Sequence, residues 1–485
     1  MRVAIIGGGI AGLSAAYELE LARRAGMDVD YELFESGARL GGVISSTVVD
    51  RTVIEHGPDS FLTEKPAAAQ LCRELGLESQ LIPSDDAQRK TFILVRNRLV
   101  ALPDGLMFLV PTKLLPTALT SLFSLTTKIR MGLELLHPPR PHTGDESVAE
   151  LVRRHYGQEA VDRLADPLLS GIYGGDSEQL SAQSVLPRLV ELEAKYGSLT
   201  RGMLAGMRER REAAAKAEAE NPETVNAPRP LFTTLRFGLQ QMVDALVNRL
   251  DEDRLRVLTR ITAVERSGHG WVVQNSNSEK LFDALIVATP AWAAAEFLAP
   301  ADRALSEELG QIPYSSSITI NLVFDGAELD PLPEGFGFLV PAVEKRAVLA
   351  CTFLHRKFPG RTAPGKSVLR AFLGGAHNAA LLAESDEALE HLVRKELFEI
   401  LRISAIPELV EVRRWPRAMA QYSVGHKERL QRIKSRLPSL PRLHLIGNAY
   451  DGIGISDCIR LGRQAARELT SATPQDAQAT VQSHT

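Results

Sequence analysis

Cysteine is scarce in this sequence of 485 residues, which contains only Cys72, Cys351 and Cys458. Three thiols that lie far apart in the chain provide neither a disulfide framework nor a Cys-x-x-Cys metal site. The sequence also lacks an H-E-x-x-H motif, a Walker loop and a serine nucleophile elbow. We therefore predict no metal site, and the sparse thiols favour a reducing compartment, the cytoplasm.

The sequence also lacks a strong excess of charge of either sign. Lys and Arg number 56, Asp and Glu number 60, and the net charge is -4. This balance gives no broad basic field, so we predict no nucleic-acid partner. Hydrophobic residues (44%) and charged residues (24%) are typical of globular proteins, and the length predicts about three structural units.

Long hydrophobic runs are absent as well. The most apolar helical stretch, residues 114–127, is interrupted by Pro116 and is too short to span about 30 Å of hydrocarbon. We expect a buried helix there, with a helix lying on a membrane surface as the alternative. No secretory signal is recognisable at the N-terminus. Membrane contact is thus predicted to be peripheral at most.

The N-terminal residues read as strand, glycine turn, helix and strand. Residues 2–6 form an apolar run, residues 10–25 have helical spacing, and residues 29–34 form a second strand that ends at Glu35. This βαβ order implies a parallel sheet.

Helices dominate the next part of the chain and strands return after residue 231. Predicted helices cover residues 112–136, 147–156, 159–169, 186–211, 384–401 and 458–469. Predicted strands cover residues 255–258, 271–274, 284–288, 316–324, 337–340, 347–353, 367–374 and 443–446, of which 316–374 are expected to form an antiparallel sheet.

The sharpest motif is the glycine turn Gly7, Gly8, Gly9, Ile10, Ala11 and Gly12, which contains G-x-G-x-x-G. Its place between a strand and a helix predicts dinucleotide binding, with the pyrophosphate at the helix N-terminus. Glu35 stands where a carboxylate would accept a hydrogen bond from a ribose hydroxyl. The plain alternative is a tight turn and a surface Glu, and the turn alone does not separate FAD from NAD.

Three further segments carry a resemblance. They are Ser36–Gly42 (SGARLGG), Glu55–Ser60 (EHGPDS) and Leu445–Ile459 (LIGNAYDGIGISDCI). With them the chain resembles the flavin-dependent amine oxidase superfamily, which includes monoamine oxidases, phytoene desaturases and porphyrinogen oxidases. For Ser36–Gly42 and Glu55–Ser60, the alternative is an ordinary glycine loop.

The resemblance implies an FAD cofactor and a role for each motif. The R-x-G-G segment would follow the diphosphate, the Gly-Pro segment would lie near the flavin ring, and the backbone of Ile261 would meet the adenine. Trp415 would lie against the flavin, and the helix start at 453–455 would face its pyrimidine oxygen. The cofactor-binding residues so implied are Gly7, Gly8, Gly9, Ile10, Ala11, Gly12, Glu35, Ser36, Arg39, Gly41, Gly42, Gly57, Pro58, Asp59, Ser60, Ile261, Trp415, Ile453, Gly454 and Ile455.

Within the superfamily the sequence is most similar to the oxygen-dependent porphyrinogen oxidases. Five segments carry this similarity: FILVRNRLVALP (92–103), SGIYGGD (170–176), GFGFLVP (335–341), ACTFLHRKFPGR (350–361) and RRWPRAMAQYSVGH (413–426). The similarity implies substrate contacts at Arg96 (a propionate), at Leu339 and Phe372 (the macrocycle faces), and at Gly171 and Gly174 (the backbone). Thr352 stands where mitochondrial and plastid relatives carry Leu.

The residues alone support these substrate contacts less strongly. Arg96 could be an outward surface charge, and Leu339 and Phe372 could be ordinary core. His355, Arg356 and Lys357 form a basic cluster that is either a solvated face or a site for extra substrate carboxylates.

We predict an α/β fold with α+β inserts, in which a discontinuous FAD-binding Rossmann-type domain is joined by an antiparallel-sheet substrate domain and a helical subdomain. The predicted ranges are 1–85, 231–290 and 408–471 for FAD binding, 86–105 and 291–407 for substrate binding, 106–211 for the helical subdomain, 212–230 for a linker and 472–485 for a disordered tail.

The predicted function is the FAD-dependent, oxygen-dependent six-electron oxidation of coproporphyrinogen III to coproporphyrin III in heme biosynthesis, with release of hydrogen peroxide. The flavin would accept the hydride, so no catalytic side chain is nominated. The partners would be the porphyrinogen, molecular oxygen and a downstream ferrochelatase. The alternatives are a protoporphyrinogen IX oxidase, an amine oxidase or carotenoid desaturase, and a non-catalytic escort protein with a dinucleotide fold.

Overall fold

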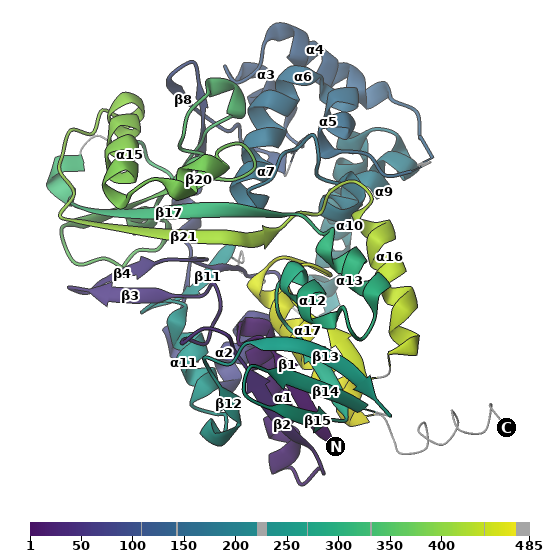
Figure 1. The fold of residues 1–485 in the computed structure, drawn as a ribbon. Coiled ribbons are helices and arrows are strands. Elements are labelled where there is room, and N and C mark those ends of the chain that lie inside the picture. Colours follow the sequence, from purple (N-terminus) through teal and green to yellow (C-terminus); the bar gives the residue numbers. More distant parts are fainter. Residues whose placement is uncertain are drawn as a thin grey trace.

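The computed structural model describes residues 1–107, 109–141, 144–220, 230–268, 270–329, 332–440 and 442–471. Two sheets organise these residues: a parallel sheet in the lower half of Figure 1 and a larger sheet above it. A group of helices lies beside the larger sheet, at the upper right of Figure 1.

The parallel sheet gathers strands from distant parts of the chain. Its five strands run in the order β12 (Leu255–Arg256), β2 (Asp30–Phe34), β1 (Arg2–Ile6), β16 (Ala284–Val287) and β22 (Leu443–Leu445). Side chains alternate between two buried layers, because Val3 and Ile5 enter one hydrophobic cluster and Ala4 and Ile6 the other. Burial on both faces is typical of a parallel sheet and explains why β1 is an unbroken apolar run.

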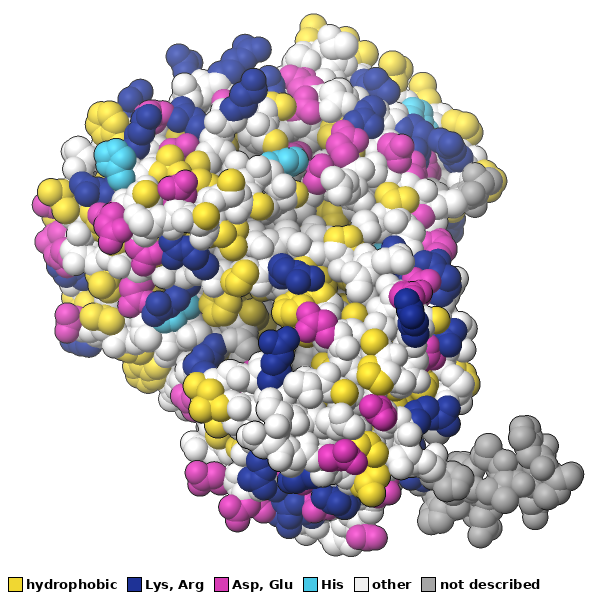
Figure 2. Space-filling view, viewed as in Figure 1, with side chains coloured by type: hydrophobic (Ala, Val, Ile, Leu, Met, Phe, Trp, Pro, Cys, Tyr) yellow, Lys and Arg dark blue, Asp and Glu magenta, His cyan; other side chains and the backbone are white. Residues whose placement is uncertain are grey.

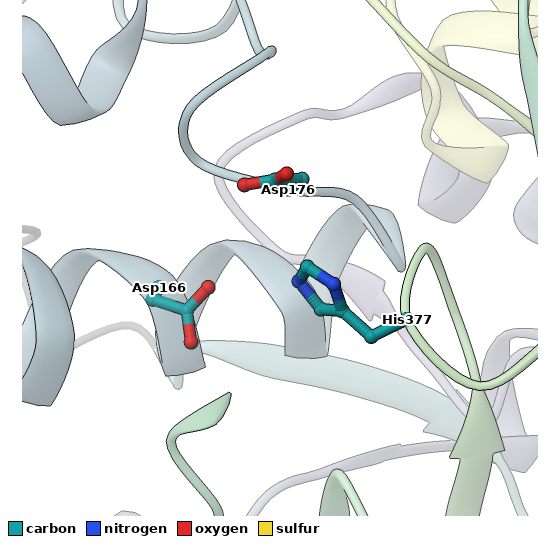
Figure 3. A group of neighbouring side chains, drawn as sticks. All are labelled: Asp166, Asp176 and His377. Atoms are coloured by element: carbon teal, nitrogen blue, oxygen red, sulfur yellow. The ribbon is translucent and has the colours of Figure 1, made fainter. Parts of the chain in front are cut away.

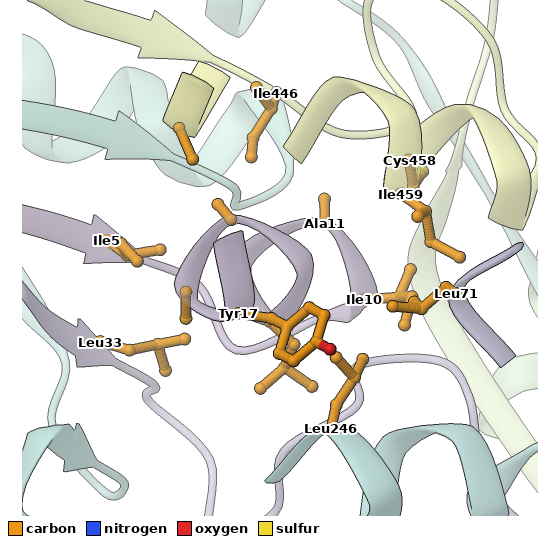
Figure 4. Close-up of a cluster of buried hydrophobic side chains, with 14 of the residues drawn as sticks. Ile5, Ile10, Ala11, Tyr17, Leu33, Leu71, Leu246, Ile446, Cys458 and Ile459 are labelled. Carbon is orange, nitrogen blue, oxygen red and sulfur yellow. The ribbon is translucent and has the colours of Figure 1, made fainter. Parts of the chain in front are cut away.

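Helices from both ends of the chain cover the first face. They are α1 (Ile10–Arg24), α2 (Ala67–Glu74), α11 (Gln240–Val247) and α17 (Ile455–Ser471). Figure 4 shows the core between them, where Ile10 and Tyr17 of α1 lie near Ile459 of α17 and Leu246 of α11. A side chain at Gly462 would place its Cβ 2.2 Å from the carbonyl oxygen of Ala11, so α1 and α17 pack in close contact.

A three-stranded antiparallel sheet and further helices cover the second face. The strands are β13 (Ile261–Ser267), β14 (Gly270–Asn275) and β15 (Glu279–Phe282), and the helices are α12 (Ala291–Leu298), α13 (Arg303–Gly310) and α16 (His426–Arg436). Trp271 of β14 is almost fully buried in this layer.

The larger sheet has seven strands. Their order is β21 (Leu409–Ala420), β17 (Tyr314–Asp325), β20 (Lys366–Gly374), β19 (Ala350–Phe353), β18 (Gly337–Leu339), β7 (Thr91–Val95) and β8 (Arg98–Ala101). Neighbours are antiparallel except β18 and β7, which are parallel. Ile318, Ile320 and Leu322 pack beneath α15 (Asp386–Leu401), whereas Thr319 and Asn321 on the opposite face bond to the backbone of residues 55–56.

The helical region comprises α3 (Leu114–Leu119), α4 (Leu125–Leu133), α5 (Val148–Tyr156), α6 (Gln158–Ala160), the π-helical turn η4 (Val161–Ala165), α7 (Asp166–Tyr173), α8 (Ala182–Val185), α9 (Pro187–Tyr196) and α10 (Leu199–Glu220). A capping box starts α5, because Ser147 and Glu150 bond to each other's backbone amides.

Short elements complete the fold. The strands are β3 (Ser46–Val49), β4 (Thr52–Glu55), β5 (Phe61–Leu62), β6 (Leu81–Pro83), β9 (Leu106–Met107), β10 (Val110–Pro111) and β11 (Phe232–Leu235). The helical turns are η1 (Glu78–Gln80), η2 (Asp86–Gln88), η3 (Glu134–Leu136), η5 (Glu252–Arg254), η6 (Gly326–Leu329), η7 (Ala342–Glu344), η8 (Ala379–Ala383), η9 (Leu437–Ser439) and α14 (Leu354–Lys357).

The predicted mixed α/β architecture is confirmed, and the N-terminal strand–turn–helix–strand unit lies where the sequence indicated it. The division into domains stays a prediction. Strand β21 pairs with β17 of the larger sheet, although residues 408–471 were grouped with the FAD-binding segments. Helix α10 continues to Glu220, into the predicted linker, while residues 221–229 and the predicted disordered tail 472–485 lie outside the described residues.

The expectation of one buried helix over residues 114–127 is wrong. Two short helices occupy the region, and Leu115, Leu119 and Leu125 are 69%, 76% and 73% exposed. Hydrophobic side chains gather at the top of Figure 2, over the region of α3 and α4. Ile129 and Leu133 of α4 are exposed as well. Among the described residues, no helix is both long and apolar enough to cross a membrane.

A buried ionic network holds the helical region together. His155 lies between two carboxylates, with Nδ1 3.0 Å from Glu134 Oε1 and Nε2 3.0 Å from Glu193 Oε1. Burial disfavours the charged imidazolium, but these hydrogen bonds outweigh it and raise the pKa of His155. Burial likewise opposes ionisation of Glu193, yet His155 and Arg154 hold its pKa at about 2.

We expect His155→Leu to lower the free energy of unfolding by about 3 kcal/mol, because Glu134 would keep its buried charge without a cation. A raised folded-state pKa makes the His155 contribution complete below the ordinary value of about 6.5 and removes it as pH rises through the raised value. Thermal unfolding should therefore separate wild type and variant most below pH 6.5. The exposed His391→Gln is the control, and a gap that widened with pH would contradict the network.

Candidate active site

The glycine turn is closed by the carboxylate of Glu35. The amide of Gly8 donates to Glu35 Oε2 (2.8 Å) and that of Gly37 to Oε1 (2.7 Å). Glu35 thus ties the end of β2 to the turn after β1. Its predicted bond to a ribose hydroxyl stays a prediction.

Two glycines of the turn have different surroundings. A Cβ on Gly12 would lie 1.9 Å from the carbonyl oxygen of Gly7, so Gly12 allows α1 to pack on the turn. A Cβ on Gly9 would meet nothing closer than Gly42 Cα at 3.9 Å. Gly9 therefore borders open space at the start of α1, where a pyrophosphate needs backbone amides. Nearby, Thr289 Oγ1 is buried and has no hydrogen-bond partner among the described residues, as expected of an atom that faces a bound polar group.

The second predicted cofactor segment folds onto this turn. Gly41 forms a bridge with Gly9 and donates its amide to the Gly8 carbonyl at 2.8 Å. Arg39 donates to its own loop, to the carbonyls of Leu40 (2.9 Å) and Ile44 (2.7 Å). Ser36 donates to Glu35 Oε1 at 3.2 Å. Arg39 therefore shapes the loop in this structure, and its contact with a phosphate stays a prediction.

The chain around Ile261 runs beside Glu35. Glu35 donates its amide to the Arg256 carbonyl and accepts from the Thr259 amide, each at 2.8 Å. Ile261 follows as the buried first residue of β13. The structure thus brings the predicted adenine segment and the predicted ribose carboxylate together.

The Gly57–Ser60 loop is held by buried cations of the larger sheet. Lys357 Nζ lies 3.0 Å from Asp59 Oδ1, and Arg370 donates to the Gly57 carbonyl with its Nη1 3.9 Å from Asp59 Oδ2. Burial alone would raise the pKa of Asp59, but the charges of Lys357 and Arg370 hold it well below its usual range. Asp59 is therefore an ionised anchor for the loop that is predicted to lie near the flavin ring.

The side chains of the predicted basic cluster, His355, Arg356 and Lys357, each have a different partner. Lys357 is buried on Asp59, Arg356 donates to the Pro333 carbonyl at 2.7 Å, and His355 bonds to the Val368 carbonyl at 3.2 Å. The helical turn α14 points the three side chains in different directions. They form neither a solvated face nor a site for substrate carboxylates.

Predicted flavin and substrate residues share one face of the larger sheet. Trp415 pairs with Ser317 and Phe372 with Thr319, two residues further along the same strand, so both side chains lie on the same face. Leu339 reaches this face through the row Leu339–Ala350–Phe372. The row Gly337–Thr352–Arg370 next to it places Thr352 there too. We call this surface the site face.

The site face contacts both the loop at residues 56–60 and helix α7. Trp415 Nε1 donates to the His56 carbonyl at 2.9 Å, next to Gly57 and Pro58. A Cβ on Gly171 would lie 3.0 Å from Leu339 Cδ2, and one on Gly174 would lie 3.1 Å from Met419 sulfur. The structure thus brings five predicted substrate residues to the site face: Gly171, Gly174, Leu339, Thr352 and Phe372.

Arg96 lies at the tip of the β7–β8 hairpin. It has φ +51°, is exposed, and donates its backbone amide to Glu344 Oε1 at 2.8 Å. Its guanidinium forms no ion pair with any described residue. Arg96 is therefore free to bind an external anion or to remain a surface charge, the two alternatives that the sequence left open.

The predicted C-terminal cofactor segment, Leu445–Ile459, includes the start of α17. Ile453 and Gly454 are half-buried, and Ile455 is the buried first residue of the helix. Asp457 Oδ2 accepts from the Gly454 amide at 3.3 Å and pairs with Lys65 Nζ at 2.6 Å. This helix start already has a carboxylate cap, so its predicted role toward the flavin stays a prediction.

The sequence did not predict one cluster of titratable side chains. Asp166 of α7, Asp176 of the following loop and His377 after β20 converge in Figure 3, with one potential ligand atom from each within 4.8 Å of the others. Burial raises the pKa of Asp166, which also accepts from the Ala342 amide at 3.0 Å. No spacing in the sequence signals this convergence, because the three segments meet only in the fold.

All three cysteines are buried and free. Burial raises the pKa of Cys72 and of Cys458 to about 12 and raises that of Cys351 further. Cys458 therefore stays a protonated thiol within α17.

A family model described as flavin containing amine oxidoreductase matches residues 10–470. The chain belongs to this family. Its cofactor is therefore FAD, and the open space at Gly9 and the unpartnered Thr289 hydroxyl fit such a group.

Relatives of similar length support this assignment. The coproporphyrinogen III oxidase of Bacillus subtilis (strain 168) is 34% identical over 470 residues, which cover 96% of this chain and 97% of the relative. The chloroplastic protoporphyrinogen oxidase 1 of Spinacia oleracea is 28% identical, with 96% and 83% covered.

Solved structures agree on the fold. A protein from Exiguobacterium sp. 255-15 has a TM-score of 0.83 at 30% identity, with 97% of this chain and 98% of that chain covered. Cyclohexylamine oxidase from Brevibacterium oxydans IH-35A has a TM-score of 0.66 at 17% identity, with 97% and 98% covered, which shows a shared fold alone.

The glycine pair provides a matched test of the cofactor cradle. We expect Gly9→Ala to change the free energy of unfolding of the flavin-free protein by less than about 0.5 kcal/mol, because its Cβ meets open space. The same methyl group should lower FAD affinity at least tenfold, since it stands where the pyrophosphate must approach the backbone. Titration of the flavin-free protein with FAD, followed by flavin fluorescence, measures this.

Gly12→Ala is the companion variant. It should destabilise the fold itself, because its Cβ would collide with the Gly7 carbonyl. Wild-type FAD affinity in Gly9→Ala would place the pyrophosphate elsewhere.

Proposed function

We propose that this chain catalyses the FAD-dependent oxidation of coproporphyrinogen III to coproporphyrin III in heme biosynthesis. Three molecules of oxygen would take up the six electrons and six protons and leave as three molecules of hydrogen peroxide. The main support is the site face, whose apolar walls Leu339 and Phe372 adjoin Trp415 and the predicted flavin loop. Relatives that match along nearly the whole chain are named for this activity.

FAD, when bound, supplies the hydride acceptor and the site that oxygen reoxidises. The protein side chains would then act by position. Leu339 and Phe372 would contact the faces of the macrocycle. Gly171 of α7 and Gly174 after it would present their backbone to the substrate, and Thr352 would form part of the pocket wall. Arg96 would bind a propionate, because its guanidinium has no competing ion pair with the described residues. No side chain is assigned as a general base.

We propose coproporphyrinogen and not protoporphyrinogen as the substrate on the basis of sequence identity. Three relatives named for coproporphyrinogen are 31–34% identical to this chain, whereas the chloroplastic protoporphyrinogen enzymes are 28% identical. Lys357 is not an argument for a tetracarboxylate substrate, because its ammonium group is paired with Asp59. The proposed partners remain molecular oxygen and a downstream ferrochelatase. We place the protein in the cytoplasm, with the exposed leucines of α3 and α4 as the surface for any peripheral membrane contact.

Aerobic turnover of the purified holoenzyme with each porphyrinogen tests the proposal. We expect porphyrin fluorescence to rise with coproporphyrinogen III at a kcat/KM at least tenfold above that for protoporphyrinogen IX. Hydrogen peroxide should form in a ratio of three to one porphyrin. A preference for protoporphyrinogen IX would reverse the substrate assignment, and turnover of neither would favour the desaturase alternative.

Arg96→Ala should raise KM for coproporphyrinogen III about tenfold, since one charge-assisted contact with a carboxylate would be lost. It should leave kcat and FAD content unchanged. Arg98→Ala, at the exposed start of β8, is the control with the same loss of charge. Equal KM values in the two variants would remove Arg96 from the site and leave it a surface charge.

A further inference from the structure

Tyr422 lies where the site face meets the C-terminal cofactor turn. Its side chain is buried, and its hydroxyl donates to the Asn448 carbonyl and accepts from the Gly452 amide, both at 3.0 Å. One hydroxyl group therefore joins the two ends of the turn that leads into α17. Burial raises the pKa of Tyr422, so the hydroxyl keeps the proton that it donates.

The ring of Tyr422 is held in its plane from one side. His426 stacks on it with centroids 4.2 Å apart and an interplanar angle of 12°. Neither ring nitrogen of His426 has a hydrogen-bond partner among the described residues, and burial lowers its pKa to about 4. His426 is thus a neutral ring that stacks on Tyr422 and lies close to the backbone of Ala449 in the same turn.

The same stretch of chain also bonds to the end of α7, to β17 and to the segment that follows α7. Gln421 Nε2 donates to the Tyr173 carbonyl (2.7 Å) and to Ser315 Oγ (2.9 Å), and the Tyr422 carbonyl accepts from the Ser181 amide at 2.8 Å. A Cβ on Gly175 would lie 2.2 Å from Gln421 Oε1, so the contact is close. Gln421 and Tyr422 therefore connect the predicted substrate backbone at 171–174 with the predicted flavin segment at 453–455.

We propose that Tyr422 is a positioning residue for the cofactor. Its hydroxyl fixes the 448–452 turn, and with it the start of α17 against FAD, while Gln421 ties the same point to the substrate side of α7. The stacked His426 sets the orientation of the Tyr422 ring. The cofactor part rests on the predicted position of residues 453–455 at the flavin, and the substrate part also rests on the proposed function.

Tyr422→Phe removes only the hydroxyl. We expect FAD affinity of the flavin-free protein to fall about tenfold, because two hydrogen bonds to the turn are lost. The visible absorption maxima of bound flavin should shift, since the start of α17 is no longer fixed. Tyr156→Phe is the matched control, because that buried hydroxyl bonds Thr200 Oγ1 at 3.3 Å inside the helical region. It should change neither FAD affinity nor the spectrum.

His426 supplies a second pair of variants. His426→Phe keeps an aromatic stack and should retain FAD affinity within twofold, whereas His426→Ala should resemble Tyr422→Phe. If Tyr422→Phe does not fold, this pair still decides the question, because equal affinities in its two members would overturn the role of the stack and the proposal with it.

The remaining outcomes are distinct. Wild-type affinity and spectrum in Tyr422→Phe would overturn the proposal, even if the variant were less stable to heat. Gln421→Met should raise KM for coproporphyrinogen III while FAD remains bound, and an unchanged KM would overturn the link to α7. Failure of the wild-type protein to oxidise any porphyrinogen would refute the proposed function but leave the FAD-binding measurements as a valid test.

Discussion

The attachment of the Glu55–Ser60 segment to the larger sheet is the contact on which the rest of the site depends. Asp59 meets Lys357 and Arg370 in a buried environment, and Glu55 pairs with Arg361. Charges removed from water are stable only when every partner is present, so these contacts tolerate little displacement. They set the distance between the predicted flavin loop at residues 57–60 and the site face of the larger sheet.

A second constraint comes from the order of the chain. The parallel sheet is complete only when β22 pairs with β16 and α17 packs on α1. Both β22 and α17 come from the last part of the chain. The segments inserted between β2 and β22 carry the larger sheet and the helical region. The predicted flavin segment at 453–455 and the site face are therefore completed together, late along the chain, by the 409–471 segment that contains β21, Tyr422 and α17.

The sequence allowed the elements with strong local patterns to be predicted. The glycine turn, Glu35 and the apolar strands β1, β16 and β20 have signatures within a few residues, and they lie where these signatures placed them. The predictions for residues 114–127 and for the basic triplet 355–357 were not confirmed. Composition cannot reveal which side of a short helix faces solvent, or in which direction α14 points each side chain. The site face could not be derived from the residues alone, since it depends on the register of β17 with both β20 and β21. The convergence of Asp166, Asp176 and His377 likewise exists only through tertiary packing.

The burial of the three thiols has a consequence for the lifetime of the protein. Peroxide attacks the thiolate form of cysteine, and an inaccessible sulfur with a raised pKa supplies almost none of it at neutral pH. In the proposed reaction each catalytic cycle releases three equivalents of that oxidant within the molecule. A chain whose sulfhydryls are all protonated and enclosed can make such a product repeatedly without sulfenic acid damage to itself, and so without a dedicated reductant to repair it.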